Sequence, residues 1–279
     1  MYFGFEDIAI AFRTKTVLQH VTLDIPRGKI VTIIGQNGCG KSSLLKTVSK
    51  AVTPRAGRVL YEGLPLDAYA PKVLARHIAY LAQVHTSPPD IDVRTLVSYG
   101  RYPYMKMGRG LSAEDGRIID KTLRLTGLEH LQRRTLRTLS GGERQRAWIA
   151  MTVCQQPEIL ILDEPTTYLD ISYQMEVLEL VRRLNREMGM TIVMVLHDLN
   201  MAARYSDYLY VIKDGGLYAG GAPGEVITQE TLRDVFRIEA DITHDVAHEC
   251  PYFIPMRILN GTAGESPTDT KCKQEEITQ

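Results

Sequence analysis

A glycine-rich segment, residues 35–42, has residue types and spacing that could hold a phosphate group. It reads Gly-Gln-Asn-Gly-Cys-Gly-Lys-Ser and fits the pattern G-x-x-x-x-G-K-[ST]. Glycines let successive backbone N–H groups surround an anion, and the start of a following helix adds unpaired donors and a positive dipole end. The segment therefore predicts a phosphate loop, in which Lys41 reaches the β- and γ-phosphates of a nucleotide and Ser42 offers its hydroxyl to Mg²⁺.

An acidic pair that follows an apolar run is a second sign of phosphate chemistry. Residues 159–162, Ile-Leu-Ile-Leu, are followed by Asp163 and Glu164. Open parallel sheets bind their ligands at the carboxyl ends of the strands. There Asp163 could hold Mg²⁺, and Glu164 could act as the general base that polarises an attacking water. The alternative is a strand that simply ends at an acidic turn. The presence of a phosphate loop in the same chain disfavours this alternative.

Residues 139–146, Leu-Ser-Gly-Gly-Glu-Arg-Gln-Arg, could bind a second anion. Ser140 with Glu143 three residues later has the pattern of a capping box, which predicts a helix over Arg144–Cys154. The two glycines after Ser140 exceed what a cap needs, and they would expose the backbone and the positive helix end to an anion. Since one chain already has a phosphate loop, this second site predicts a second ATP, bound by a second subunit.

The hydrophobic pattern predicts the elements that would position these groups. Ile30–Ile34 is an apolar, β-branched run of strand length before the phosphate loop, and helical spacing resumes after it. Residues 2–25 alternate as antiparallel strands do, and residues 84–157 have helical spacing. Further elements are expected at 58–62 (strand), 78–83 (strand), 159–162 (strand), 171–188 (helix), 191–196 (strand), 199–205 (helix) and 209–212 (strand). This alternation predicts an α/β fold with a parallel sheet covered on both faces.

The domain organisation follows from the same pattern. We expect a core with an antiparallel β-subdomain at 1–84 and 158–259, and an inserted helical subdomain at 85–157 that carries the 139–146 motif. Glycine pairs at 215–216 and 220–221 are expected to mark hairpin turns. Residues 260–279 are rich in Thr, Glu, Lys, Ser and Gly, which predicts a disordered tail.

Composition excludes several classes of protein. The chain has 279 residues, with 33 Lys+Arg and 33 Asp+Glu, so no overall charge favours nucleic acid or an anionic membrane. Residues 1–12 do not form a secretory signal, and no apolar run approaches the length of a membrane span. The four cysteines are widely spaced without a C-x-x-C motif, which suits a reducing cytosol.

The motifs together, in this order, strongly resemble those of the ATP-binding-cassette (ABC) ATPases. The matching segments are Gly35–Ser42 (P-loop), Gln83 (Q-loop), Leu139–Gln145 (signature), Ile159–Glu164 (Walker B), Leu169-Asp170 (D-loop) and His197 (switch histidine). The resemblance implies a RecA-like P-loop NTPase core, ATP and Mg²⁺ as cofactors, and hydrolysis of ATP to ADP and phosphate.

The resemblance also implies a role for individual residues. ATP would be bound by Phe12, Gly35, Gln36, Asn37, Gly38, Cys39, Gly40, Lys41, Ser42, Ser43, Ser140, Gly141, Gly142 and Asp170. Lys41, Gln83, Glu164 and His197 would be catalytic, and Ser42, Gln83 and Asp163 would bind Mg²⁺. Phe12 looks like the residue that stacks on adenine, although that loop usually carries tyrosine. The residues Ser140–Gly142 would meet the γ-phosphate of the opposite subunit's ATP, and Asp170 would join the two sites across the dimer.

Four further segments, made up mainly of non-catalytic residues, narrow the resemblance to the ATPase subunits of bacterial ferric-siderophore importers. They lie at Gly100–Tyr104, Gly142–Met151, Pro165–Asp170 and Leu196–Ala202, and the likeness extends from Tyr2 to Arg257. It implies a homodimer at the cytoplasmic face of the cell membrane. Its partners would be transmembrane permease subunits and, indirectly, a substrate-binding protein, with no nucleic acid. Importers of haem, cobalamin or a metal ion remain alternatives, as does a soluble ABC ATPase with no role in transport.

Three further features remain, and the first two have two interpretations each. Cys39 either only fills space in the loop or is a reactive thiol, because Lys41 and the start of the helix would favour its thiolate form. His244, His248 and Cys250 could suggest a metal sensor, but their spacing has no rigid ligand pattern and favours a structural or exposed role. A surface groove around residues 98–104 is expected to receive a partner helix, with Arg101 and Tyr102 in contact with it.

Overall fold

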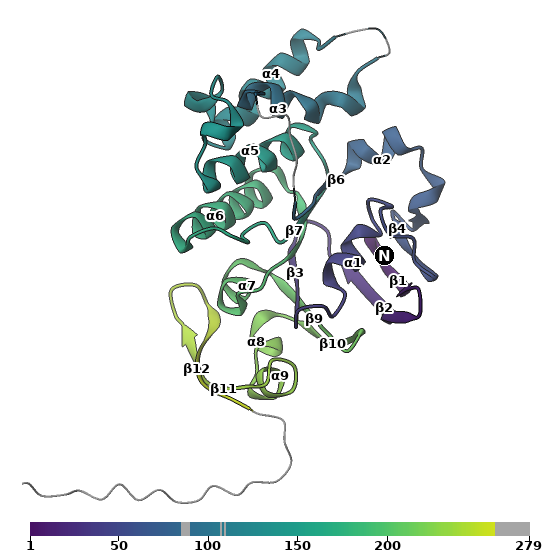
Figure 1. Cartoon of the computed structure of the whole chain (residues 1–279), viewed down its shortest axis with the longest axis vertical. Helices are drawn as coiled ribbons and strands as arrows, with labels where there is room; N and C mark the ends of the chain where they lie inside the picture. Colours follow the sequence, from purple (N-terminus) through teal and green to yellow (C-terminus); the bar gives the residue numbers. More distant parts are fainter. Residues whose placement is uncertain (85–89, 107, 109, 260–279) are drawn as a thin grey trace, which may run out of the picture.

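A six-stranded sheet carries the phosphate loop at the centre of the protein (Figure 1). The structure is a computed structural model that describes residues 1–84, 90–106, 108 and 110–259. Within these residues the strand order is β10 (Gly216–Gly221), β9 (Tyr208–Lys213), β3 (Ile30–Gly35), β8 (Thr191–Val195), β7 (Ile159–Asp163) and β6 (Ile78–Leu81). All neighbouring pairs are parallel except β10 with β9. The predicted parallel sheet is therefore confirmed.

The two faces of this sheet are covered by different kinds of element. Successive residues of β3 point to opposite faces, so Ile30 and Ile34 pack in one core and Val31 and Ile33 in the other. The first core is closed by helices, chiefly α5 (Gly141–Cys154) and α6 (Ile171–Met188). The second is closed by the short helix α1 (Lys41–Lys46) together with an antiparallel sheet, which agrees with the predicted antiparallel β-subdomain.

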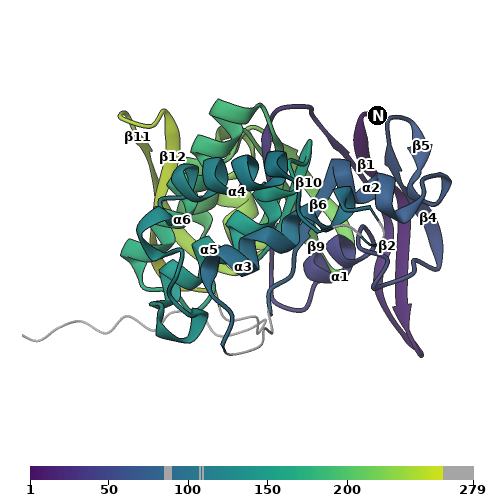
Figure 2. The ribbon, with the colours of Figure 1, turned by 90° about the horizontal axis from the view of Figure 1, so that it is seen from above.

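The antiparallel sheet stands at one end of the molecule, as Figure 2 shows. In the described chain its order is β2 (Lys15–Ile25), β1 (Phe3–Phe12), β4 (Ala56–Tyr61) and β5 (Leu64–Pro65). Apolar side chains alternate along β1 and β2, and their buried members include Phe3, Phe5 and Leu18. The 3-10 turn η1 (Leu66–Ala68) and helix α2 (Pro71–His77) lead from this sheet to β6. The predicted antiparallel strands are confirmed.

A helical region between β6 and β7 has a core of its own. It contains α3 (Val93–Ser98), η2 (Tyr99–Tyr104), α4 (Ala113–Leu125), η3 (Glu129–Leu131), η4 (Leu136–Thr138) and α5. Buried leucines from these elements, such as Leu96, Leu123 and Leu136, pack together. The predicted helical character is confirmed. The boundary of a helical subdomain at residue 85 falls outside the described residues and stays a prediction.

The C-terminal part contains elements that the sequence pattern did not predict. After α7 (Leu199–Tyr205), β9 and β10, the chain forms α8 (Pro223–Val226), α9 (Gln229–Asp234) and a hairpin of β11 (Ile238–Asp245) and β12 (Cys250–Ile258). The predicted turn at Gly220-Gly221 is wrong, because both glycines lie in β10. A Cβ at Gly220 would lie 2.7 Å from the Tyr210 ring, so the glycine permits close packing.

Two further observations concern the limits of the chain. No helix among the described residues is long and apolar enough to cross a membrane. The predicted disordered tail, residues 260–279, lies outside the described residues.

Candidate functional site

The phosphate loop connects the carboxyl end of β3 to the first residue of α1. Its backbone conformation depends on glycine. Gly40, which precedes the helix, has φ +105°, and a Cβ there would lie 2.5 Å from the Leu18 side chain of β2. At Gly35 a Cβ would lie 2.2 Å from the carbonyl oxygen of Ile212 in β9. The loop therefore needs glycine for its own turn and for its close approach to neighbouring strands.

Lys41 turns its side chain back into this loop. Its Nζ donates hydrogen bonds to the carbonyl oxygens of Gly35 and Gln36, both at 2.8 Å, and lies 3.8 Å from Sγ of Cys39. The side chain is buried. An ammonium group held inside a loop of backbone N–H groups provides a localised positive charge for a phosphate oxygen.

A cavity of about 240 Å³ brings most of the predicted phosphate-loop residues together with Glu164 and His197. It is lined by Val17, Asn37, Gly38, Gly40, Lys41, Ser42, Ser43, Glu164 and His197. The phosphate loop, the acidic end of β7 and His197, two residues after β8, therefore converge on one space, as their positions at the carboxyl ends of parallel strands predict. Val17 of β2, which packs over the loop, was not predicted from the sequence.

Asp163 is buried at the end of β7, and only one of its oxygens has a partner. Its Oδ2 accepts a hydrogen bond from the hydroxyl of Tyr80 at 3.1 Å. Its Oδ1 has no hydrogen-bond partner in the described chain. Burial raises the pKa of Asp163, and the hydroxyls of Ser42 and Tyr80 partly offset that effect. A buried carboxylate oxygen without a partner, close to a serine hydroxyl, fits the oxygen ligands that Mg²⁺ prefers.

Glu164 has partners on both of its carboxylate oxygens. His197 places Nε2 at 2.8 Å from Oε1, and Gln83 donates from Nε2 to Oε2 at 2.5 Å. The hydroxyl of Thr167 donates to Oε2 at 3.0 Å. Glu164 itself has φ +54°, a strained backbone for a residue with a side chain. The structure thus gathers Gln83, Glu164 and His197, as the motifs predict. Thr167 was missed, although it lies only three residues after Glu164.

The signature segment, Leu139–Gln145, lies away from this cavity. Ser140 caps α5 by accepting a hydrogen bond from the Glu143 backbone N–H at 3.2 Å, and Glu143 Oε2 accepts from the Ser140 N–H at 2.8 Å. The predicted capping box is confirmed. These bonds to Ser140 lower the pKa of the Glu143 carboxyl. No residue of the segment lines the cavity around the phosphate loop in the described chain.

The signature glycines pack against the start of α6, next to the D-loop. A Cβ at Gly142 would lie 2.3 Å from the ring of Tyr173, and one at Gly141 would lie 3.3 Å from Leu169. Tyr168 and Ile171, on either side of the D-loop, are 94% and 68% exposed. The signature and the D-loop therefore form one continuous surface, separate from the phosphate loop of the same chain.

The groove expected at residues 98–104 needs one correction. Arg101 does not lie on the surface, because its guanidinium is buried against Asp115, with Nε and Oδ1 2.8 Å apart. It also donates to the carbonyl oxygen of Cys154 at 2.9 Å and lies over the Tyr104 ring. Tyr99 and Tyr102, in contrast, are 50% and 75% exposed. Only the tyrosines are therefore available to a partner.

Two other predicted groups lie outside the cavity. Phe12 is half exposed at the end of β1, and its role toward adenine stays a prediction. In the C-terminal hairpin, Nδ1 of His248 lies 2.7 Å from Oδ2 of Asp245. No group of three or more His, Cys, Asp or Glu residues that could hold a metal ion occurs in the part of the chain that the structure describes. The roles of His244, His248 and Cys250 stay predictions.

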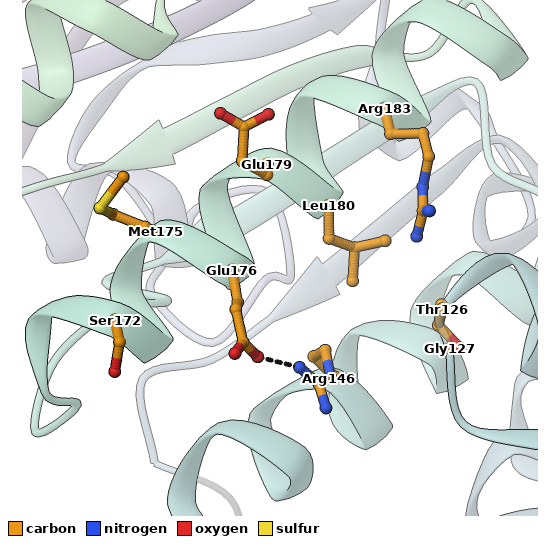
Figure 3. Close-up of a pocket in the computed structure, with 9 residues that line it drawn as sticks. All are labelled: Thr126, Gly127, Arg146, Ser172, Met175, Glu176, Glu179, Leu180 and Arg183. Carbon is orange, nitrogen blue, oxygen red and sulfur yellow. Dashed lines mark hydrogen bonds and ion pairs between the residues drawn. The ribbon is translucent and has the colours of Figure 1, made fainter. Parts of the chain in front are cut away.

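A larger cavity, about 730 Å³, lies between α5, α6 and the turn after α4 (Figure 3). Its lining includes an ion pair between Arg146 and Glu176, with the apolar side chains of Met175 and Leu180 nearby. No described residue of the phosphate loop lines this larger cavity, and neither Glu164 nor His197 does. The smaller cavity, where Lys41, Glu164 and His197 converge, is therefore the candidate site.

Comparison with known proteins identifies related sequences along nearly the whole chain. Residues 18–167 match the model of the family described as ABC transporter. The ferric enterobactin transport ATP-binding protein of Escherichia coli (strain K12) is 43% identical over 251 residues, which is 90% of this chain and 93% of that protein. The iron(3+)-hydroxamate import ATP-binding protein of Bacillus subtilis (strain 168) is 44% identical over 240 residues, covering 86% of this chain and 89% of the relative.

Solved structures of similar fold extend the comparison. The ADP conformation of an ATP-binding cassette of an ABC transporter has a TM-score of 0.74 at 25% identity, covering 84% of this chain and 95% of that one. A dimeric cassette in a post-hydrolysis state, bound to ADP and Pi, has a TM-score of 0.67 at 26% identity, covering 79% and 98%.

Proposed function

Because this chain belongs to the ABC transporter family of ATPases, which couple ATP hydrolysis to transport, we propose that it energises import of a ferric siderophore through a separate membrane permease. The observation that carries the catalytic part is the convergence of Lys41, Glu164 and His197 on one cavity. The substrate class is supported by relatives named for ferric enterobactin and iron(3+)-hydroxamate transport, at 43% and 44% identity over most of the chain.

In the proposed reaction the phosphate loop binds ATP. Backbone N–H groups of residues 36–43 surround the β- and γ-phosphates, and the buried Lys41 supplies positive charge. Asp163 Oδ1, Ser42 and Gln83 would hold Mg²⁺. When bound, Mg²⁺ would neutralise charge that develops on the phosphate oxygens. Glu164 then orients the attacking water and takes its proton, and His197 contacts the γ-phosphate.

Glu164 must exchange partners before it can do this. Its two oxygens accept from His197, Gln83 and Thr167, so little capacity is left for a water. A phosphate group in the cavity would offer His197 an alternative acceptor, which would free Oε1 of Glu164 for its role as base. Gln83 would bind Mg²⁺ through its amide oxygen, the atom that it does not use toward Glu164.

We place the complete site at the interface of two copies of the chain. Separation of the signature surface from the phosphate loop supports this arrangement, because neither surface alone would enclose a γ-phosphate. Each ATP would then lie between one chain's phosphate loop and the Ser140–Gly142 segment of the other, in a two-fold dimer. Asp170 and the exposed Tyr168 and Ile171 would be buried in the same interface. A cassette of similar fold is dimeric with ADP and Pi bound.

We further propose that the permease docks at the exposed tyrosines of η2, at the cytoplasmic face of the membrane, and that a substrate-binding protein delivers the ligand on the other side. Tyr99 and Tyr102 present apolar rings with hydroxyl tips, the residue type that is enriched at protein interfaces. The segment that carries them is fixed by Arg101 and by the Tyr104 hydroxyl, which donates to the Gln155 carbonyl oxygen at 3.0 Å. Tyr102→Ala should leave folding intact and reduce uptake.

The experiment that tests the function is uptake of labelled compounds in cells lacking this gene. Ferric siderophores, haem, cobalamin and manganese are compared, with rescue by wild type or by Glu164→Gln. Rescue of one ferric siderophore by wild type alone supports the proposal. Rescue of haem, cobalamin or manganese assigns a different importer, and no change in any uptake favours an ATPase without a transport role.

A further inference from the structure

One side chain connects the C-terminal hairpin to the helix that follows the switch histidine. Asn200, in the first turn of α7, forms two hydrogen bonds with the backbone of Phe253 in β12. The Phe253 N–H donates to Oδ1 of Asn200 at 3.0 Å, and Nδ2 of Asn200 donates to the Phe253 carbonyl oxygen at 3.1 Å. The carboxamide thus pairs with the strand as a neighbouring strand residue would, which fixes both its position and its orientation.

Helix α7 depends on such contacts for its position. It spans only Leu199–Tyr205, and a helix of two turns has little stability of its own. Its first turn is capped by Asp198, whose Oδ1 accepts from the Met201 N–H at 2.9 Å. Since His197 immediately precedes this cap, whatever fixes the first turn of α7 also fixes the backbone of His197.

The hairpin is itself firmly attached to the core. Phe253 and Ala240 are 6% and 1% exposed and pack in the same apolar cluster as β7, β8 and α6. The Gln229 side chain of α9 donates a hydrogen bond to the Ala240 carbonyl oxygen. Figure 1 shows the hairpin beside α7, at the end of the molecule opposite the helical region. A free two-stranded hairpin would be marginally stable, so this packing makes it a rigid support.

From these contacts we propose that Asn200 is a positioning residue for the switch histidine. Through its paired bonds with Phe253, the C-terminal hairpin holds the first turn of α7, and with it the backbone of His197, at the wall of the cavity where the imidazole can reach a bound phosphate. The hairpin lies outside residues 18–167, which match the family model, and the proposal gives it a role in hydrolysis. It rests on the proposed function, because it assumes that His197 acts on bound ATP.

The first test replaces Asn200 by leucine, which has a similar size and can form neither bond. Asn185→Leu is the matched control, because the Asn185 amide also bridges two backbone segments, donating to the carbonyl oxygens of Gly28 at 2.9 Å and Met190 at 2.7 Å. Gly28 and Met190 precede the amino ends of β3 and β8, whereas the cavity lies at the carboxyl ends of these parallel strands. In the purified full chain, Asn200→Leu should lower kcat for ATP at least about tenfold with KM within about twofold, whereas Asn185→Leu should leave kcat nearly unchanged.

The second test separates positioning from general damage. Asn200→Leu is combined with His197→Ala, and single-turnover hydrolysis is measured for both single variants and the double variant. If Asn200 acts through His197, the double variant hydrolyses ATP as slowly as His197→Ala alone. If the loss from Asn200→Leu is the same in both backgrounds, or if kcat of Asn200→Leu stays within about twofold of wild type, the proposal is overturned.

A folding defect of the Asn200 variant and an error in the proposed function give different results. Should Asn200→Leu fail to fold, Asn200→Asp is used, because it retains the acceptor for the Phe253 N–H and replaces the donor by an oxygen that faces the Phe253 carbonyl; its kcat should lie between those of wild type and His197→Ala. An unchanged kcat for Asn200→Asp would then overturn the proposal. Absence of ATP hydrolysis by wild type would contradict the proposed function itself, which is a different result from an unaffected Asn200 variant.

Discussion

His197 and Glu164 are direct partners: Nε2 of the imidazole lies 2.8 Å from Oε1 of the carboxylate. The two residues follow neighbouring strands, since β8 and β7 pair in parallel up to Asp163 and Val195. The sheet therefore aligns them before any ligand is bound. The same carboxylate accepts from Gln83, which follows β6 on the other side of β7. Three adjacent strands thus deliver the three side chains on which hydrolysis is proposed to depend.

Glu164→Gln should separate ATP binding from hydrolysis. The amide keeps the size of the side chain and one acceptor oxygen, for either Gln83 or His197, but it cannot take a proton from water. We expect hydrolysis to fall by about 10²-fold or more, measured as phosphate release, while ATP affinity stays near that of wild type. Because ATP would remain bound, the variant should also elute as a dimer in saturating MgATP. A variant that binds ATP and remains monomeric would contradict the shared site.

Gly142→Ala should disturb the signature through packing. The added Cβ would lie 2.3 Å from the Tyr173 ring and 3.0 Å from its Cβ, so α5 and α6 must move apart. We expect a lower thermal midpoint, with a loss of about 1–3 kcal/mol in the free energy of unfolding, and weaker ATP-dependent dimerisation. Thermal unfolding and gel filtration measure the two effects separately.

The Tyr173→Ala background is the control for this variant. Removal of the ring creates space for the new methyl group, so stability should recover in the double variant. If ATP hydrolysis recovers as well, close packing is the main reason for glycine at this position. If stability returns without hydrolysis, glycine at position 142 is needed for the action on the nucleotide as well as for packing.

Cys39 should be a site of inhibition by thiol reagents. Its side chain faces the interior of the phosphate loop, since a Cβ at Gly35 would lie 3.0 Å from its sulfur, and Lys41 Nζ is 3.8 Å away. An alkyl group there would displace Lys41. We expect loss of ATPase activity in proportion to labelling, with protection by MgATP. Cys39→Ala should retain activity and resist the reagent, and full activity of stoichiometrically labelled Cys39 would refute the prediction.

The sequence predicted the parts of the site that depend on local chemistry. A glycine loop after Ile30–Ile34 and an acidic pair at the end of β7 are recognisable because spacing alone places them at strand ends. Contacts between residues that are far apart in the sequence could not be predicted in this way. The prediction that Arg101 lies on the surface was wrong, because the residues next to Arg101 in the sequence do not indicate that it pairs with Asp115, fourteen positions later.

The C-terminal hairpin was missed for a related reason. Its strand β12 exposes Tyr252, Ile254 and Met256 and buries Phe253 between them, so apolar side chains occupy both faces and the alternation that marks a half-buried strand is absent. The pairing of Asn200 with Phe253 joins residues 53 positions apart, and no local pattern predicts it.

The Arg101–Asp115 pair gives the stability of the helical region a defined pH dependence. Bonds from Ser112, and then from Arg101, lower the pKa of the Asp115 carboxyl from 3.8 to about 2, although burial opposes the shift. A carboxyl whose folded pKa is lowered stabilises the fold fully above its unfolded pKa, and that contribution is lost as pH falls from about 4 toward 2. Arg101→Met should cost roughly 3 kcal/mol at pH 7, because Asp115 would be left buried without its countercharge, with only Ser112 among the described residues to bond it.

The difference in unfolding free energy between wild type and Arg101→Met should therefore be largest above pH 4 and should shrink at lower pH, where Asp115 becomes protonated. Chemical denaturation between pH 2.5 and pH 7 measures it. Tyr102→Ala is the matched control on the same turn, because the Tyr102 side chain is 75% exposed and its loss should change stability by less than about 0.5 kcal/mol at any pH. A pH-independent difference for Arg101→Met would mean that the guanidinium stabilises the turn through the Cys154 carbonyl and the Tyr104 ring, and that Asp115 contributes little.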